Sequence, residues 1–274
     1  CDYNYVFDPD VRLKRYFADG AKGEYIFLID EAHNLVPRAR EMYSAVLIKE
    51  DVLAAKRLVK DKSPRLTRQL ERVNKIFLEM KRQCEGWQIL ADADHLVTAL
   101  TSLFSELEKY MDEYKGSEGR EELLDFYFTV RNFLNIYERV DEHYRIYTEL
   151  TEAGDFKIKL LCVNPIVHIG ECLAQGNSSV FFSATLLPIR YYRQLLSNDE
   201  EDYTVYVNSP FSQEHRLLLA AADVTSRYTR RNRTEYRKIL DYIRQAAEAR
   251  KGNYIVFFPS YQYMNHVLEL LYDG

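Results

Sequence analysis

Two short apolar segments, each ending in reactive polar residues, constrain the fold of this chain most. The first runs from Tyr25 to Ile29 and is followed at once by Asp30-Glu31-Ala32-His33. The second covers Ser179 to Ser183 and continues into Ala184-Thr185. Apolar runs without alternation, bounded by Gly or charged residues, are typical of strands that are buried on both faces of a parallel sheet. We therefore predict an α/β domain in which both polar motifs follow strand ends at one edge of the sheet.

The region between these segments, residues 46–155, has a pattern that predicts helices. Apolar residues recur there in alternating steps of four and three, which is the spacing of one helix face. Three such stripes are formed by Leu66, Leu70, Val73, Phe77, Met80, Cys84 and Trp87, by Leu96, Leu100, Leu103, Leu107, Tyr110 and Tyr114, and by Leu123, Tyr127, Val130, Leu134 and Tyr137. We predict an all-helical insertion, an antiparallel bundle that interrupts the α/β domain.

Strand patterns return from about residue 156. Strand candidates cover residues 157–163, 202–207, 217–222 and 253–258, and a helix is expected from about Asn232 to Arg250. Strands that alternate with helices indicate a parallel α/β sheet. We expect residues 1–45 and 156–198 to form one α/β domain, residues 46–155 to form the insertion, and residues 203–274 to begin a second α/β domain after the acidic stretch at 198–202.

Composition excludes several classes of protein. With 47% hydrophobic and 29% charged residues, the chain is neither disordered nor of low complexity. No run approaches the roughly eighteen apolar residues of a membrane span. The net charge of −5 gives no general basic signature, so nucleic-acid binding has to be argued from local clusters. Four scattered cysteines without a Cys-x-x-Cys pair argue against a structural metal site and favour reduced thiols in a cytosolic protein.

The two polar motifs are suited to nucleotide chemistry. Of two adjacent acids after a strand, one can hold Mg²⁺ through its water shell while the other orients an attacking water. Hydroxyl residues after the neighbouring strand can hydrogen-bond His33 or an acid and so couple this site to another surface. Each motif alone has an ordinary reading: an acidic pair arises by chance in a chain with 42 acids, and Ser-Ala-Thr can be a helix cap.

Four segments together resemble the XPD/DinG family of superfamily 2 DNA helicases. They are Cys1-Asp2-Tyr3-Asn4-Tyr5-Val6-Phe7-Asp8-Pro9, Phe27-Leu28-Ile29-Asp30-Glu31-Ala32-His33-Asn34-Leu35, Val180-Phe181-Phe182-Ser183-Ala184-Thr185-Leu186-Leu187-Pro188 and Tyr254-Ile255-Val256-Phe257-Phe258-Pro259-Ser260-Tyr261. Asp30 and Ser183 are 153 positions apart, and members of this family carry a helical arch domain between these two motifs. The resemblance implies RecA-like motor domains, ATP-driven translocation on single-stranded or forked DNA, and duplex unwinding in DNA repair or replication.

The resemblance also implies roles for individual residues. Asp30 would bind Mg²⁺, and Glu31 would be the general base toward the γ-phosphate of ATP. His33, together with Ser183, Ala184 and Thr185, would couple hydrolysis to DNA movement. The candidates for DNA contact are Tyr3, Tyr5, Ser260 and Tyr261.

Other family parts have no match in this chain and are expected outside it. These are the phosphate-binding loop and the ligands of a 4Fe-4S cluster, both upstream of Cys1, and an arginine motif downstream of Gly274. On that expectation the chain alone would not hydrolyse ATP. Arg227, Arg230, Arg231 and Arg233 are interpreted instead as a solvated basic loop that can touch phosphate. A further basic cluster at the start of the insertion could line a strand channel and comprises Lys56, Arg57, Lys60, Lys62, Arg65, Arg68 and Arg72.

Two alternatives remain open at the level of sequence. One is a non-catalytic module that binds DNA or a protein partner, and the other is an RNA helicase of the DEAH class. The long spacing between Asp30 and Ser183 argues against the second. A helicase of this kind would be expected in the cytoplasm of a bacterium or the nucleus of a eukaryote, without membrane association.

Overall fold

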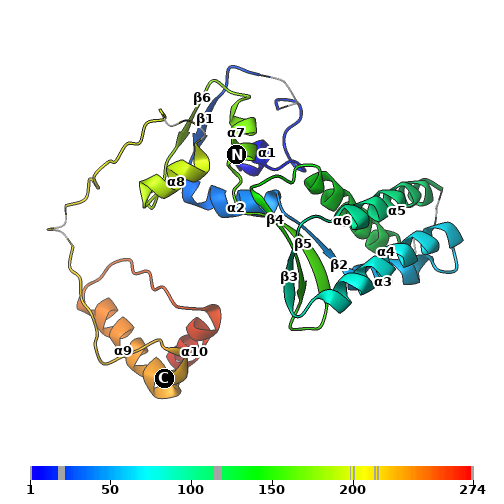
Figure 1. The fold of residues 1–274 in the computed structure, drawn as a ribbon. Helices are drawn as coiled ribbons and strands as arrows, with labels where there is room; N and C mark the ends of the chain where they lie inside the picture. Colours follow the sequence, from blue (N-terminus) through cyan, green and yellow to red (C-terminus); the bar gives the residue numbers. More distant parts are fainter. Residues whose placement is uncertain are drawn as a thin grey trace. The chain divides into compact units, whose positions relative to one another are not determined.

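The computed structural model of the 274-residue chain separates into two compact units, Cys1–Val205 and Tyr206–Gly274 (Figure 1). It describes residues 2–17, 22–113, 116, 119–197, 199, 201–212, 214 and 216–272. Cys1 and Tyr114, which took part in the motifs above, lie outside these residues. No described helix is both long enough and apolar enough to cross a membrane.

Two parallel strands organise the α/β part of the first unit. Strand β1 (Ile26–Ile29) pairs with β6 (Ser178–Phe181), and the register places Ile29 opposite Phe181. The strands predicted at these two segments are therefore confirmed. Four helices accompany them: α1 (Asn4–Phe7), α2 (Leu35–Met42), α7 (Ile166–Leu173) and α8 (Ile189–Leu196). A 3₁₀ turn, Ala32–Asn34, links β1 to α2.

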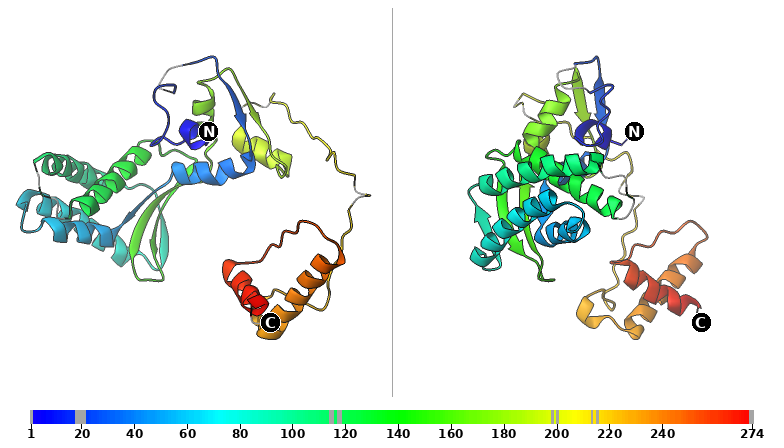
Figure 2. Two further views of the ribbon diagram at one scale, coloured as in Figure 1. Left: turned by 180° about the vertical axis from the view of Figure 1, so that it is seen from behind. Right: turned by 90° about the vertical axis from the view of Figure 1, so that its right-hand side faces the viewer.

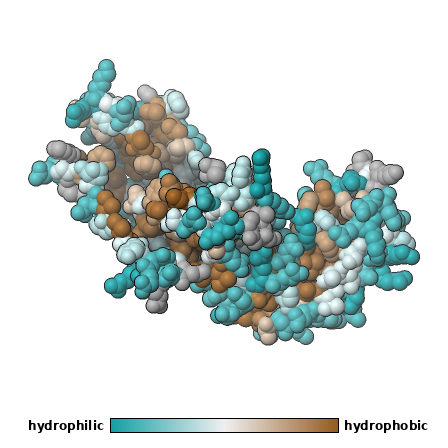
Figure 3. Space-filling model, turned by 90° about the horizontal axis from the view of Figure 1, so that it is seen from above, coloured by the Kyte–Doolittle hydropathy of each residue, from teal (hydrophilic) through white to brown (hydrophobic). Residues whose placement is uncertain are grey.

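Burial of these strands differs from the prediction. Phe27 and Ile29 are buried in a core with residues of α2 and α7, but Ile26 and Leu28 on the opposite face are 67% and 69% exposed. Val180 of β6 is also half exposed. The expectation of burial on both faces is wrong because only one face of this two-stranded sheet is covered in the described residues. Figure 3 shows apolar side chains reaching the surface in several places.

The insertion contains a sheet as well as helices. Its helices are α3 (Lys49–Val59), α4 (Pro64–Gln83), α5 (Asp94–Glu113) and α6 (Arg120–Tyr137). Its strands are β2 (Ala45–Ile48), β3 (Trp87–Leu90), β4 (Tyr144–Leu150) and β5 (Phe156–Cys162). They form an antiparallel sheet in the order β2-β5-β4-β3, beside which the helices pack (Figure 2). The prediction of an all-helical segment over residues 46–155 is therefore wrong.

The boundary predicted at residue 156 is wrong for the same reason. The sequence pattern predicts β5 as part of the parallel sheet, but β5 pairs antiparallel with both β2 and β4. Its side chains alternate, with Phe156, Ile158, Leu160 and Cys162 buried and the intervening residues partly exposed. This alternation is typical of a sheet that is covered on one face, here by the helices of the insertion. The insertion therefore extends from β2 through β5.

The helical stripes are largely confirmed. In α4, Ser63 caps the amino terminus by accepting a hydrogen bond from the Leu66 amide at 3.3 Å, and Pro64 occupies the first turn. The predicted positions of α4 and α5 pack together in one core. In α6 the buried face is displaced, because Phe126 and Phe133 are buried while Tyr127 and Leu134 are only partly so. Trp87 belongs to β3 and is exposed, so it is not part of a helical stripe.

The second unit is built on two helices, α9 (Arg233–Ala249) and α10 (Tyr261–Tyr272). Asn232 caps α9 by accepting the Glu235 amide at 3.0 Å, and the helix predicted from Asn232 to Arg250 is confirmed. A 3₁₀ turn, Tyr228–Arg230, precedes it. The predicted strands at 202–207, 217–222 and 253–258 do not form among the described residues. Their backbones lack a partner strand there, and without one an isolated extended segment stays exposed to water.

Candidate functional site

The two predicted motifs meet at the carboxyl ends of β1 and β6. Parallel pairing in register brings the ends of both strands to the same edge of the sheet. The Phe182 amide continues the ladder by donating to the Ile29 carbonyl at 3.0 Å, and the Ala32 amide donates to the Phe182 carbonyl at 3.2 Å. Ser183 and the Asp30-Glu31 pair therefore lie side by side at this edge, although the two motifs are far apart in sequence. This position is where open α/β sheets bind their ligands.

Four side chains form a hydrogen-bonded cluster at this edge. The Ser183 hydroxyl donates to Glu31 Oε2 at 3.0 Å, and its Oγ lies 2.8 Å from His33 Nδ1. The Thr185 hydroxyl lies 3.3 Å from the same ring nitrogen, and the Thr185 amide donates to Ser183 Oγ at 3.2 Å. Since the single hydroxyl proton of Ser183 goes to Glu31, Nδ1 of His33 must carry the proton in the contact with Ser183. His33 Nδ1 also lies 3.1 Å from Glu31 Oε2, so Ser183 and the ring converge on the same carboxylate oxygen.

The backbone at Glu31 is held in an unusual conformation. Glu31 has φ 49° and ψ 39°, in the left-handed region, and it is the single described non-glycine residue with positive φ. The Glu31 amide donates to Asp30 Oδ1 at 2.7 Å. Left-handed backbone is costly for a residue with a Cβ, and such conformations concentrate at functional sites. The turn carries the Glu31 carboxylate back to Ser183, while 59% of this side chain stays exposed to solvent.

Asp30 supplies one exposed carboxylate beside this cluster. Mg²⁺ keeps several waters and is usually held by one or two carboxylates together with substrate phosphates. A single exposed carboxylate such as that of Asp30 therefore fits a Mg²⁺ ion whose remaining ligands are waters and phosphate oxygens. No group of three or more His, Cys, Asp or Glu side chains among the described residues could hold a metal by itself.

The other predicted site residues are not part of this cluster. Ala184 lies in the turn between its two hydroxyl neighbours. Tyr3 packs partly against the core of the α/β part, and Tyr5 on α1 is 42% exposed. Ser260 caps α10 in the second unit, where its Oγ accepts the Tyr263 amide at 3.2 Å. Tyr261 beside it is exposed.

The basic cluster at the start of the insertion lies on α3, α4 and the turn between them. Lys56 is partly buried and forms an ion pair with Glu71 at 2.9 Å. The other six members are exposed: Arg57, Lys60, Lys62, Arg65, Arg68 and Arg72. Their position on helices that pack a common core gives the insertion a charged outer surface.

A buried polar junction between the α/β part and the insertion was missed at the level of sequence. His168 on α7 is 4% exposed, stacks on Tyr43 with ring centroids 4.2 Å apart, and places Nε2 2.8 Å from the hydroxyl of Tyr144 on β4. The Tyr43 hydroxyl donates to the Phe7 carbonyl at 2.7 Å. Burial lowers the pKa of His168 and raises that of Tyr43. The sequence signal for this junction is His168 itself, a histidine within a largely apolar helical run.

Comparison with known proteins gives a likeness in structure but not in sequence. No family model matches the chain, and no curated protein matches it in sequence. The solved structure of Xpd4 from S. tokodaii is similar, with a TM-score of 0.54 at 17% identity. The match covers 98% of this chain and 55% of that one, so the chain spans about half the length of the structure that it matches. The likeness is one of fold: an α/β arrangement of a parallel sheet and helices.

Proposed function

We propose that this chain is the central segment of an ATP-dependent DNA helicase of the XPD/DinG kind. One observation carries the proposal: side chains of two motifs 152 positions apart are hydrogen-bonded to one another at the ends of paired parallel strands. A chance acidic pair or a helix cap would not require this connection. The fold shared with Xpd4 of S. tokodaii supports the same conclusion.

In this proposal Glu31 is the general base of ATP hydrolysis. Its exposed carboxylate accepts a proton from the water that attacks the γ-phosphate, and the hydrogen bond from Ser183 to Oε2 orients it. Asp30 would hold Mg²⁺, which when bound neutralises charge on the phosphates. A phosphate-binding loop and an arginine motif outside this chain would complete the site, so the chain alone would not hydrolyse ATP.

Ser183, His33 and Thr185 connect the base to the chain that follows β6. When the Glu31 carboxylate takes up a proton during hydrolysis, its hydrogen bond from Ser183 has to readjust. The Thr185 amide donates to the same Ser183 Oγ, so the backbone at Thr185 moves with it. This is a direct physical route from nucleotide state to the segment that begins at Ser183. DNA would lie near Tyr3, Tyr5, Ser260 and Tyr261, and the basic outer surface of the insertion would flank a single strand.

The experiment compares substitutions in the intact protein that contains this chain. Glu31→Gln should abolish ATP hydrolysis while leaving nucleotide binding intact. Glu41→Gln on α2, an exposed acid 3.8 Å from Arg38, is the matched control and should hydrolyse ATP normally. Ser183→Ala should lower ATP hydrolysis and its stimulation by single-stranded DNA while nucleotide binding is retained, because Glu31 loses the hydrogen bond that orients it. Full activity of Glu31→Gln would contradict the proposal, and stronger stimulation by RNA than by DNA would favour the DEAH-class alternative.

A further inference from the structure

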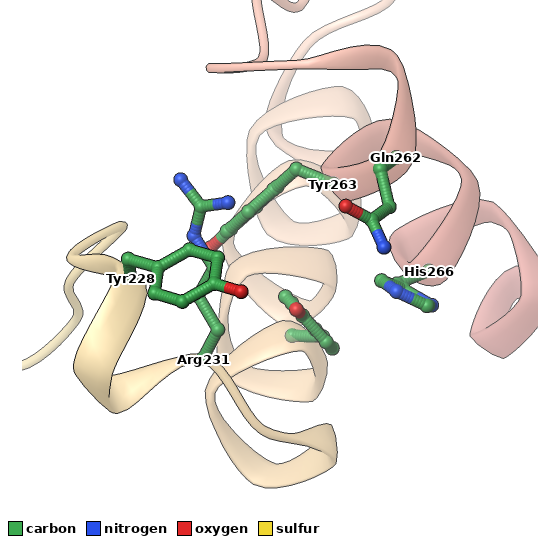
Figure 4. Close-up of a pocket in the computed structure, with 6 residues that line it drawn as sticks. Tyr228, Arg231, Gln262, Tyr263 and His266 are labelled. Atoms are coloured by element: carbon green, nitrogen blue, oxygen red, sulfur yellow. The ribbon is translucent and has the colours of Figure 1, made fainter. Parts of the chain in front are cut away.

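The second unit contains a pocket that the motifs above do not explain. Its volume is about 310 Å³, and it is lined by Tyr228, Arg231, Tyr236, Gln262, Tyr263 and His266 (Figure 4). Figure 4 shows Tyr228 and Arg231, on the 3₁₀ turn and the segment before α9, across from Gln262 and His266 of α10, while the Tyr263 side chain extends toward Arg231. A volume of this size is at the lower end of small-molecule sites.

Arg231 is fixed between two aromatic rings at one side of the pocket. Its guanidinium carbon lies 5.3 Å from the ring centroid of Tyr228 and 5.1 Å from that of Tyr263. Its Nε donates to the Ser226 carbonyl at 3.0 Å. The planar cation is therefore held by contacts on its faces and by one of its nitrogens, which leaves its position defined before any ligand arrives.

A buried acid holds the loop that carries these residues. Glu235 is 6% exposed and accepts the Thr225 amide at 3.2 Å. The same carboxylate pairs with Arg230 at 3.7 Å and with Lys238 at 3.4 Å. A buried carboxylate requires such partners, so the segment from Thr225 to Arg231 is tied to the first turn of α9. The pocket is preorganised on this side rather than formed by a loose loop.

Tyr263 belongs to an aromatic cluster that lines the pocket and contains an unsatisfied hydroxyl. Tyr236 and His266 stack with centroids 5.2 Å apart and an interplanar angle of 21°, and Tyr236 meets Tyr263 edge-on at 4.9 Å. Tyr263 is 2% exposed, and its buried hydroxyl has no hydrogen-bond partner among the described residues. A buried polar atom without a partner is unusual, and it marks this cluster as a place where a polar ligand atom or a water belongs.

We propose that this pocket receives a base of a single-stranded nucleic acid. The exposed ring of Tyr228 offers a stacking surface, whereas Arg231 and Gln262 offer hydrogen-bonding groups to a base edge. Arginines beside the pocket, Arg227 and Arg230 on the exposed turn, are placed to meet the phosphates that flank that base. Stacking combined with a basic track is the pattern by which proteins hold single strands. Ser260 and Tyr261, the DNA-contact candidates of this unit, directly precede Gln262.

This proposal shares its ligand class with the proposed function but rests on a different site. Binding to the pocket requires neither Glu31 nor ATP, so the two can fail separately. The test uses the full chain, short oligo(dT) and oligo(rU), and an abasic oligonucleotide of equal length and charge. Binding of each fluorescently labelled strand is measured by anisotropy, first at low salt. The abasic strand retains the phosphates and removes the bases, so the ratio of affinities isolates the contribution of stacking.

Tyr228→Ala is the diagnostic variant because the side chain is 80% exposed and outside the core. It should weaken binding of oligo(dT) at least about fivefold and leave binding of the abasic strand nearly unchanged. Tyr228→Phe should bind like the original chain, since the ring is retained. Tyr272→Ala, which removes an exposed tyrosine of α10 outside the pocket, is the matched control and should have no effect.

Two results would overturn the base pocket. One is unchanged oligo(dT) and oligo(rU) affinity in Tyr228→Ala, which would leave the helicase proposal to be judged by ATP hydrolysis. The other is an equal loss for the abasic strand, which would show that Tyr228 contributes no recognition of a base. A loss for oligo(rU) alone would keep the pocket and assign it to RNA.

Discussion

The left-handed backbone at Glu31 makes a quantitative prediction about substitutions there. At an ordinary exposed helix position, glycine is less stable than alanine by about 1 kcal/mol. At φ 49° the order should reverse, because a Cβ costs about 1–2 kcal/mol in this region and glycine avoids that cost. The greater freedom of glycine in the unfolded chain offsets about 0.4–1 kcal/mol of the gain. Glu31→Gly should therefore be more stable than Glu31→Ala by about 1 kcal/mol.

Comparing these two variants removes other contributions. Both lose the carboxylate and its hydrogen bond from Ser183, so their difference reports the backbone alone. Arg38 is the control: it lies within α2 with half of its side chain exposed, and Arg38→Ala should be more stable than Arg38→Gly. The free energy of unfolding is measured by urea denaturation with circular dichroism. Hydrogen exchange in the peptide spanning β1 and α2 then locates the change.

An alanine variant at position 31 that equals or exceeds the glycine variant would refute the reasoning, since it would mean that Glu31 carries no backbone strain. If the reversal occurs, a stability cost lies at the proposed general base. The chain then retains a strained residue where glycine would give a more stable backbone, as is expected when a side chain is needed for chemistry.

Two further predictions concern the first unit. Burial lowers the pKa of His168 below its ordinary 6.5, so the unfolded chain binds the proton more readily than the folded chain. The free energy of unfolding should therefore decrease as pH falls below about 6.5. His168→Gln should flatten this pH profile, measured by urea titrations between pH 5 and 8. An increase in stability toward pH 5 would be inconsistent with a buried neutral imidazole. Leu100→Ala, at a fully buried position of α5, should lower the free energy of unfolding by about 2–5 kcal/mol, whereas Leu124→Ala at a 36% exposed position should cost far less; equal effects would contradict the described core.

Sequence patterns predicted those elements whose signal is local. The strands at the two motifs and the helices α4 and α5 follow from runs and stripes that need no knowledge of distant residues. The antiparallel sheet was missed although β4 alternates visibly, with Tyr144, Ile146 and Thr148 buried. β4 adjoins the helical stripes, and β2 runs directly into α3, so the helical period dominated the interpretation.

The strands predicted in and before the second unit fail for a different reason. The segments around Leu218 and Phe257 have strand composition, yet composition cannot supply the neighbouring strand that pairs their backbone. At the site, residue types predicted that Glu31, His33, Ser183 and Thr185 are related. They could not predict the left-handed turn at Glu31 or which hydroxyl donates to which acceptor, because both depend on how β1 and β6 are aligned.

The antiparallel pairing of β2 with β5 has a consequence for how the chain folds. β1 and β6 meet across about 150 residues, which by itself is a slow, entropically costly closure. Ala45 and Leu160 are partners in the register, so a folded insertion brings its two ends together. The effective loop between Ile26 and Ser178 then shrinks about fourfold, which lowers the closure cost by about 1 kcal/mol. We therefore expect the insertion to fold first and to bring β1 and β6 close together, so that Ser183 can reach Glu31.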